Sequence, residues 1–273
     1  MTRPHQSRVR KLLSAKRSRH AVLVTEDEAL RNVLKSLTFA EALDIARSLG
    51  KLSTGSEGLD ELLGGGYEEG KITEVFGASN SGKTQLAIQA TVTAAAQGWK
   101  SVYVDTESTF RPERVVQMAE SRDLEAKAVL DSVYSLRARD VEGQSQVMRR
   151  MADDPRVSSA KLVVVDTVTK NFTLEFPGRE RMGRRQGALG AYLNRIAIDA
   201  YLHRRVVILT NRVASITVGG MSKDVNVGGL TLGRFVSRSI RLRREGGYVY
   251  AGVEYPTTAG RPIRCRLSEK GVE

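Results

Sequence analysis

A glycine-rich loop that ends in a lysine and a threonine carries the clearest chemistry in the 273-residue chain. It fits the phosphate-loop pattern G-x-x-x-x-G-K-[ST] throughout, with the residues Gly77, Ala78, Ser79, Asn80, Ser81, Gly82, Lys83 and Thr84. The glycines allow successive backbone N–H groups to point at an anion, and a helix starting after the loop adds partial positive charge. Lys83 can reach the β- and γ-phosphates, and the Thr84 hydroxyl can bind Mg²⁺. The loop therefore predicts a nucleotide site for ATP and Mg²⁺.

Two acidic residues that follow apolar runs could complete a hydrolytic site. Asp166 ends the run 161–166, and after a phosphate loop such an aspartate is expected to hold Mg²⁺ through water, opposite Thr84. Glu107 follows the run 101–105, at the sheet edge where ligands of α/β proteins bind, so its carboxylate can orient and deprotonate an attacking water. We therefore predict Glu107 and Lys83 as catalytic residues and Asp105 as a structural neighbour.

The elements that must position these residues alternate along the chain. Apolar runs predict strands at 72–76, 101–105, 132–136, 161–166 and 205–210. Helical patterns lie at 84–96, 111–120, 140–152 and 184–203. Because helices separate apolar strands, we expect an α/β fold with a mainly parallel central sheet and helices on both faces. Three later runs predict C-terminal antiparallel strands that extend the sheet, at 236–243, 248–255 and 263–267.

Composition narrows the class of protein further. Hydrophobic residues make up 41% of the chain, and the single cysteine and three histidines exclude a disulfide framework and a thiolate metal cluster. No apolar run is long enough to span a membrane and no secretory signal is present, so we expect a cytoplasmic, nucleoid-associated protein without a membrane partner. The net charge of +12 favours a nucleic acid as partner.

The charge also suggests how the chain is divided. Residues 1–25 are expected to form a disordered basic tail, which can contact DNA non-specifically or remain solvated. Residues 26–50 are predicted to be a short helical linker, and residues 51–273 the ATPase core.

Longer motifs make a family resemblance specific. The segments 52–66, 72–86 and 103–114 resemble the RadA branch of the RecA-type recombinases, and the similarity runs from about residue 37 to the C-terminus. The chain looks most like an archaeal RadA paralogue of the RadB and RadC group. The resemblance implies a RecA-type P-loop ATPase core in which Gln85 also belongs to the nucleotide loop and Arg114 stacks on the adenine. It gives Glu107 the catalytic role and Asp166 the Mg²⁺ role.

The resemblance also implies two loops that bind single-stranded DNA. The first loop, at 175–186, contains Arg179, Arg181, Arg184 and Arg185. Glu180 is the one acidic residue between these arginines. Guanidinium groups suit phosphate and give salt-sensitive affinity, although a solvated helix face is the alternative interpretation. The second, at 213–227, is expected to be flexible and has Lys223 as its internal cation.

Four departures from the family pattern affect the expected function. Arg212 stands where active recombinases have a glutamine that senses the γ-phosphate; arginine cannot accept a hydrogen bond but could neutralise phosphate charge. The family's N-terminal DNA-binding domain is replaced by the basic tail and linker. Leu37 and Ala40 occupy the F-x-x-A segment that joins recombinase protomers, where Leu37 could fill the partner's pocket or simply pack within its own helix. The residues that cover a neighbour's ATP are also changed.

These observations predict an ATPase with slow hydrolysis that binds single-stranded DNA. We expect it to assist or regulate a RadA-type recombinase or another paralogue during homologous recombination and DNA repair, with homo-oligomers a further possibility. The alternatives are an active strand-exchange recombinase, a KaiC-like signalling ATPase without a DNA role, and a module that holds ATP without turnover.

Overall fold

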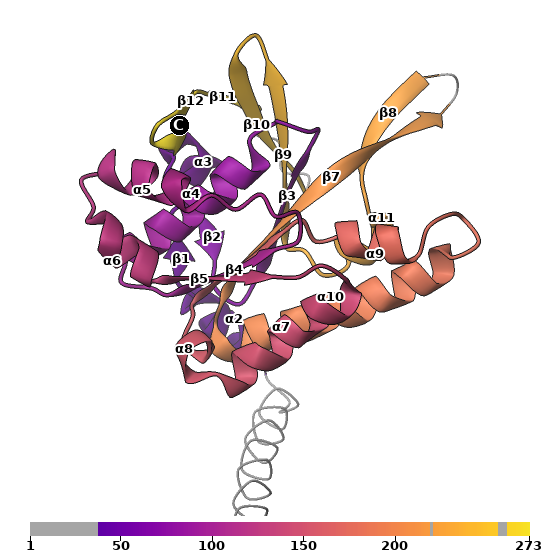
Figure 1. Cartoon of the computed structure of the whole chain (residues 1–273), viewed down its shortest axis with the longest axis horizontal. Coiled ribbons are helices and arrows are strands. Elements are labelled where there is room, and N and C mark those ends of the chain that lie inside the picture. The colour runs from indigo at the N-terminus through magenta and orange to yellow at the C-terminus, as the bar shows by residue number, and fades with distance from the viewer. Residues whose placement is uncertain (1–37, 219–220, 256–260) are drawn as a thin grey trace, which may run out of the picture. The chain divides into compact units, whose positions relative to one another are not determined.

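The computed structural model describes residues 38–218, 221–255 and 261–273 (Figure 1). The chain divides into two compact units, Met1–Ser48 and Leu49–Glu273. In the first unit, helix α2 (Phe39–Arg47) begins at a capping box, in which the Thr38 hydroxyl accepts a hydrogen bond from the Glu41 N–H and the Glu41 carboxylate accepts one from the Thr38 N–H. Ala40 lies exposed on this helix. The predictions for Leu37 and the tail 1–25 fall outside the described residues.

A mainly parallel sheet organises the second unit. Within the described residues it has nine strands, in the order β11-β10-β9-β3-β7-β6-β4-β5, with β8 paired to β7. The bounds are β3 (Ile72–Gly77), β4 (Ser101–Asp105), β5 (Val133–Arg137), β6 (Leu162–Asp166), β7 (Val206–Val218), β8 (Met221–Asn226), β9 (Arg238–Glu245), β10 (Tyr248–Tyr255) and β11 (Ile263–Cys265). Strand β10 is antiparallel to both of its neighbours, β9 and β11, and β9 joins the sheet parallel to β3. The predicted α/β fold with C-terminal antiparallel strands is confirmed.

Helices cover both faces of the sheet (Figure 1). One buried cluster joins strand residues such as Val164 to α4 (Lys83–Ala96), α5 (Pro112–Glu120) and α6 (Ala126–Asp131). The other joins alternate strand residues such as Val165 to α7 (Val141–Asp153), α9 (Lys170–Glu175), α10 (Met182–His203) and α11 (Gly229–Gly233). The strands are apolar at successive positions because each face of the sheet packs against helices.

Several short elements complete the unit and were not expected from the sequence. They are β1 (Lys51–Leu52), α3 (Glu57–Leu63), β2 (Tyr67–Glu68), α8 (Pro155–Ser158), β12 (Leu267–Ser268) and β13 (Gly271–Val272). Their patterns are too short to show a periodicity. No helix in the described ranges is long and apolar enough to cross a membrane.

The segment 213–227 was expected to be a flexible loop, and that expectation is wrong. Strand β7 continues to Val218 and pairs with β8 as an antiparallel hairpin, in register from Val213 opposite Asn226 to Val218 opposite Met221. The physical reason is its β-branched content, with Val213, Ile216, Thr217 and Val218 on one strand, which favours extended structure.

A buried carboxylate lies at the base of this hairpin. Glu74 of β3 is fully buried and accepts hydrogen bonds from Asn211 Nδ2 at 2.8 Å, Asn226 Nδ2 at 2.9 Å and Ser239 Oγ at 2.8 Å. These donors belong to β7, β8 and β9, so one side chain links four strands around the point where the hairpin leaves the sheet.

Candidate nucleotide site

The glycine-rich loop connects the central strand β3 to helix α4. Gly82 adopts a left-handed conformation with φ of 103°, which glycine takes without steric cost. Gly77 is required for a different reason, because a Cβ there would lie 2.3 Å from the backbone oxygen of Leu242 in the adjacent strand β9. The loop therefore has the strand, glycine turn and helix context that the sequence predicts.

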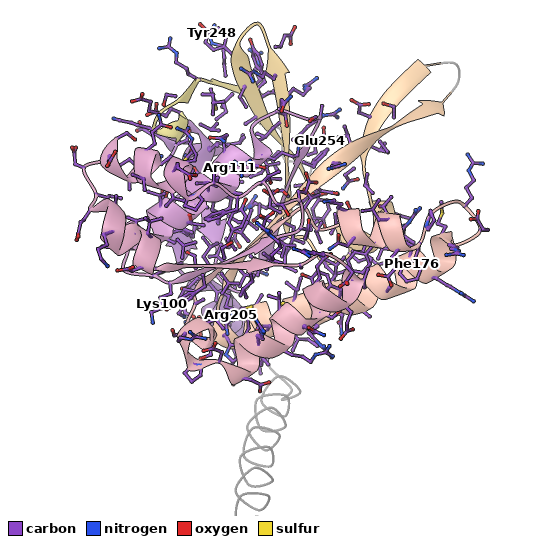
Figure 2. The ribbon with its side chains drawn as sticks, viewed as in Figure 1. Lys100, Arg111, Phe176, Arg205, Tyr248 and Glu254 are labelled. Carbon is purple, nitrogen blue, oxygen red and sulfur yellow. The ribbon has the colours of Figure 1, made fainter. Side chains whose placement is uncertain are left out.

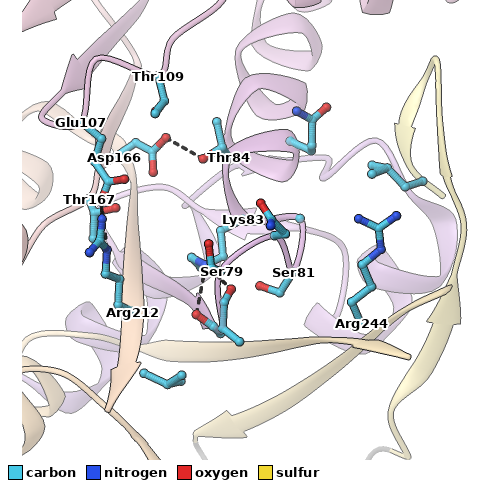
Figure 3. A pocket seen from close by; sticks show the side chains of 17 residues that line it. Ser79, Ser81, Lys83, Thr84, Glu107, Thr109, Asp166, Thr167, Arg212 and Arg244 are labelled. Atoms are coloured by element: carbon cyan, nitrogen blue, oxygen red, sulfur yellow. Dashed lines mark hydrogen bonds and ion pairs between the residues drawn. The ribbon is translucent and has the colours of Figure 1, made fainter. Parts of the chain in front are cut away.

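A cavity of about 670 Å³ lies over this loop. Its lining includes the whole segment from Gly77 to Gln85 together with Glu107, Thr109, Asp166, Thr167, Arg212, Val213, Arg244 and Leu267 (Figure 3). A volume of this size suits a small-molecule ligand. The structure thus brings the predicted loop residues, Glu107, Asp166 and Arg212 to one cavity, although they are far apart in the sequence.

Lys83 projects from the first turn of α4 back over the loop. Its Nζ donates to the backbone oxygen of Ala78 at 2.6 Å and to that of Gly77 at 3.0 Å. Burial lowers the pKa of Lys83 below its ordinary value, and the charges of Asp166 and Glu107 oppose this shift. An anionic ligand that replaced the two carbonyl oxygens would gain a partly desolvated ammonium group.

Hydroxyl groups hold the Asp166 carboxylate from three sides. Its Oδ2 accepts from Thr84 Oγ1 at 2.9 Å and from the Tyr103 hydroxyl at 2.6 Å, and its Oδ1 accepts from the Thr210 hydroxyl. Sequence reasoning missed Tyr103 and Thr210, which lie on β4 and β7 and reach Asp166 through the order of the strands.

Thr84 and Asp166 offer two oxygen donors suited to Mg²⁺ beside the phosphate loop. A hydroxyl and a carboxylate are the oxygen donors that Mg²⁺ prefers, and their 2.9 Å separation lets both face one ion. Among the described residues no cluster of three or more His, Cys, Asp or Glu could hold a metal. This donor set therefore fits an ion that takes its other ligands from nucleotide phosphates and water.

Glu107 and Arg212 form an ion pair at the end of the cavity near Asp166. Arg212 Nη2 lies 2.5 Å and Nε 3.1 Å from Glu107 Oε1 (Figure 3). The parallel register of β3 and β7 sets Arg212 opposite Gly77, directly beside the start of the loop. Asp105 fixes the turn that carries Glu107, because its carboxylate accepts hydrogen bonds from the N–H groups of Glu107 and Thr109.

Arg114 does not line the cavity, although it contacts a residue that does. Its Nε donates to Gln85 Oε1 at 2.6 Å, its Nη2 to the Ser268 oxygen at 2.6 Å and its Nη1 to the Glu269 oxygen at 3.1 Å. The guanidinium edge is occupied by these acceptors. Stacking of Arg114 on a base remains a prediction.

The four arginines of the predicted first DNA loop gather around the start of α10. Arg179, Arg181 and Arg184 are exposed, and half-buried Arg185 donates to the Phe176 oxygen at 3.3 Å (Phe176 is labelled in Figure 2). None of the four forms an ion pair with the described part of the chain. Positive charge at a helix N-terminus opposes the helix dipole, so this cluster does not stabilise the helix. Lys223 lies on β8, with its side chain outside the described set.

Comparison with known proteins shows the family to which the chain belongs. The Rad51 family model matches residues 46–272, so the chain belongs to the Rad51/RadA family. Proteins of this family are ATPases, and membership implies ATP binding and DNA binding.

Three curated relatives carry the name DNA repair and recombination protein RadA. The protein from Ignicoccus hospitalis is 41% identical over 61% of this chain and 54% of its own length. The Aeropyrum pernix protein is 36% identical over 81% of this chain and 72% of its own length. The Metallosphaera sedula protein is 36% identical over 77% of this chain and 68% of its own length. The chain therefore spans little more than half of the Ignicoccus relative.

Proposed function

We propose that this protein is a RadA paralogue that binds ATP with Mg²⁺ and single-stranded DNA. It hydrolyses ATP slowly and assists or regulates a RadA-type recombinase, or another paralogue, in homologous recombination and DNA repair. The observation that carries the proposal is the ion pair between Glu107 and Arg212 beside the phosphate loop.

The cavity supports a defined division of roles in hydrolysis. The loop N–H groups and Lys83 bind the phosphates, with Gln85 at the cavity wall. Thr84 and Asp166 hold Mg²⁺, which when bound neutralises phosphate charge. Glu107 orients a water for in-line attack on the γ-phosphate and accepts its proton.

Slow hydrolysis follows from the state of Glu107. Arg212 engages Oε1 of Glu107 through two nitrogens, which leaves only Oε2 to orient a water until the pair opens. Nucleotide binding brings negative charge to the same end of the cavity and competes for Arg212. Turnover therefore requires the ion pair to open, and Arg212 limits how often that happens.

The same strand supports a link between ATP and DNA. Arg212 lies on β7 immediately before the hairpin, and the neighbouring Asn211 is held by the buried Glu74. We assign the exposed arginines around residues 179–185, and Lys223 on the hairpin, to the phosphates of single-stranded DNA. Arginine contacts to phosphate give affinity without base readout.

The other proposed features concern assembly and chain organisation. The core is residues 51–273, preceded by a linker at 26–50 and a tail at 1–25. The segment containing Leu37 and Ala40 provides the contact with a second protomer or a recombinase, and Arg114 contributes to the nucleotide site through Gln85.

One dataset tests the proposed function. The rate of ATP hydrolysis is measured with and without single-stranded DNA at several salt concentrations, together with strand exchange by the purified protein alone. We expect a slow basal rate that DNA changes, an effect that weakens as salt rises, and no efficient exchange. Efficient strand exchange would support the active recombinase instead, and a rate indifferent to DNA would favour the signalling ATPase.

A further inference from the structure

The C-terminal strands form part of the cavity over the phosphate loop, and the phosphate-loop motif does not predict this contribution. The register of β3 and β9 sets Gly77 opposite Leu242, and a Cβ on Gly82 would meet Val249 and Val272 at 3.6 Å and 3.8 Å. The loop therefore lies against strands β9, β10 and β13.

Arg244 extends from β9 into this region. Leu242, two residues earlier, is buried in the core cluster that contains α4, and side chains two apart share one face of a strand. Arg244 thus projects on the α4 side, opposite Val249 of β10, and lines the cavity. The adjacent Arg243 projects to the other face, where it lines a separate shallow pocket with Tyr250.

The position of Arg244 along the cavity indicates which part of a nucleotide it meets. Glu107 and Arg212 lie on one side of the phosphate loop, and Arg244 lies on the opposite side (Figure 3). Because Glu107 and Asp166 mark the γ-phosphate end, Arg244 lies toward the nucleoside end. Leu267, an apolar side chain, lines the same cavity.

The charge of Arg244 is unused within the protein. Its side chain is exposed and makes no hydrogen bond or ion pair to the described residues, whereas Arg241 of the same strand pairs with Glu254 at 2.8 Å. Arg114, the other guanidinium near this end, is held by four acceptors, including Gln117. Of these three arginines, Arg244 is therefore the one whose N–H groups have no acceptor among the described residues.

We propose that Arg244 binds the nucleoside end of ATP by stacking its guanidinium on the base, with Leu267 supplying an apolar neighbour. This inference rests on the proposed ATP site and adds a binding residue to it. A guanidinium is planar and weakly hydrated, which suits the face of an aromatic ring. Because every base has such a face, this contact adds affinity without selecting adenine over guanine.

Calorimetric titration of the full chain with ATP, GTP and inorganic tripolyphosphate, each with Mg²⁺, tests the proposal. Arg244→Ala should weaken ATP and GTP binding alike, by roughly 2- to 30-fold, and leave tripolyphosphate binding unchanged. Arg244→Lys keeps the charge but not the plane and should remain weak. Arg243→Ala, the matched control on the opposite face, should bind all three ligands as the parent does.

Three results would overturn the assignment. If Arg244→Ala loses tripolyphosphate binding as much as ATP binding, Arg244 is a phosphate ligand. If Arg244→Ala binds ATP as the parent does, Arg244 is not part of the site. If Arg114→Ala loses ATP binding and Arg244→Ala does not, the base lies against Arg114. The proposed function fails separately, if the parent protein binds neither ATP nor tripolyphosphate or if Lys83→Ala leaves both affinities intact.

Discussion

The guanidinium of Arg212 lies 2.5 Å from Oε1 of Glu107, so the carboxylate best placed to activate a water is paired with a cation. The Arg212 side chain is 56% exposed, and exposed pairs contribute only about 0.2–1 kcal/mol. Such a pair opens readily when a competing anion arrives. In the proposed function this ion pair restrains hydrolysis without blocking the site, as expected for a slow ATPase that responds to its ligand.

Removing the carboxylate charge of Glu107 tests its role in the chemical step. Glu107→Gln should lower kcat by roughly 10²- to 10⁴-fold, because the amide cannot accept a proton from water. ATP affinity should change little, because the phosphate loop supplies the binding contacts. Rates come from steady-state phosphate release and affinities from titration. A kcat within a factor of two of the parent value would remove Glu107 from the catalytic role.

The Tyr103 hydroxyl should matter for Mg²⁺ because it holds the Asp166 carboxylate at 2.6 Å. Tyr103→Phe keeps the ring that packs on Phe110, with centroids 4.6 Å apart, and removes only the donor. We expect the Mg²⁺ concentration for half-maximal hydrolysis to rise by roughly 3- to 10-fold, with kcat at saturating Mg²⁺ nearly unchanged.

Tyr192→Phe is the matched control, since Tyr192 is a buried tyrosine that packs in the other core cluster. If both variants shift the Mg²⁺ requirement equally, the effect is one of general stability and Tyr103 has no positioning role.

The arginine cluster predicts a measurable salt dependence of DNA binding. Each phosphate neutralised on single-stranded DNA contributes about 0.7 to the slope of log affinity against log salt. Replacing Arg179 and Arg184 with alanine should reduce that slope by roughly 1.4 and weaken binding similarly for all sequences. Arg195→Ala, an exposed arginine further along the same helix, is the control. An unchanged slope in the double variant would place the DNA elsewhere.

Glu74 should give the protein a pH-dependent stability. Burial raises the pKa of Glu74 above its ordinary 4.5, although hydrogen bonds from Asn211, Ser239 and Asn226 oppose the shift. The folded state then binds this proton more tightly than the unfolded state does. Its stabilising contribution is present below pH 4.5 and is lost as pH rises through the folded-state pKa.

Chemical denaturation across pH, comparing the parent with Glu74→Gln, isolates this contribution. The difference in unfolding free energy between the two should fall as pH increases above 4.5, by at most about 1.4 kcal/mol per pH unit. A difference that stays constant with pH would show that Glu74 does not titrate in this way.

The sequence predicted features made of contiguous residues better than features that depend on contacts between distant segments. The loop from Gly77 to Thr84 is contiguous and lies between a strand and a helix, so its spacing was enough to predict its position. Tyr103 begins the family-like segment 103–114, but neither its contact with Asp166 nor the place of Arg244 at the cavity was predicted, because both depend on the order and register of strands far apart in the sequence. The segment after Arg212 was expected to be a flexible loop because that prediction followed the family resemblance, and the β-branched residues that form the hairpin were not considered.

The single-turnover rate of ATP hydrolysis by Arg212→Gln tests the account most directly. Glutamine cannot form the ion pair, so Glu107 is released and the rate should rise by roughly two- to fivefold, the equivalent of about 0.4–1 kcal/mol. In a Glu107→Gln background the same substitution should have no effect. A rate that falls in Arg212→Gln would contradict the account and make Arg212 a stabiliser of the transferring phosphate.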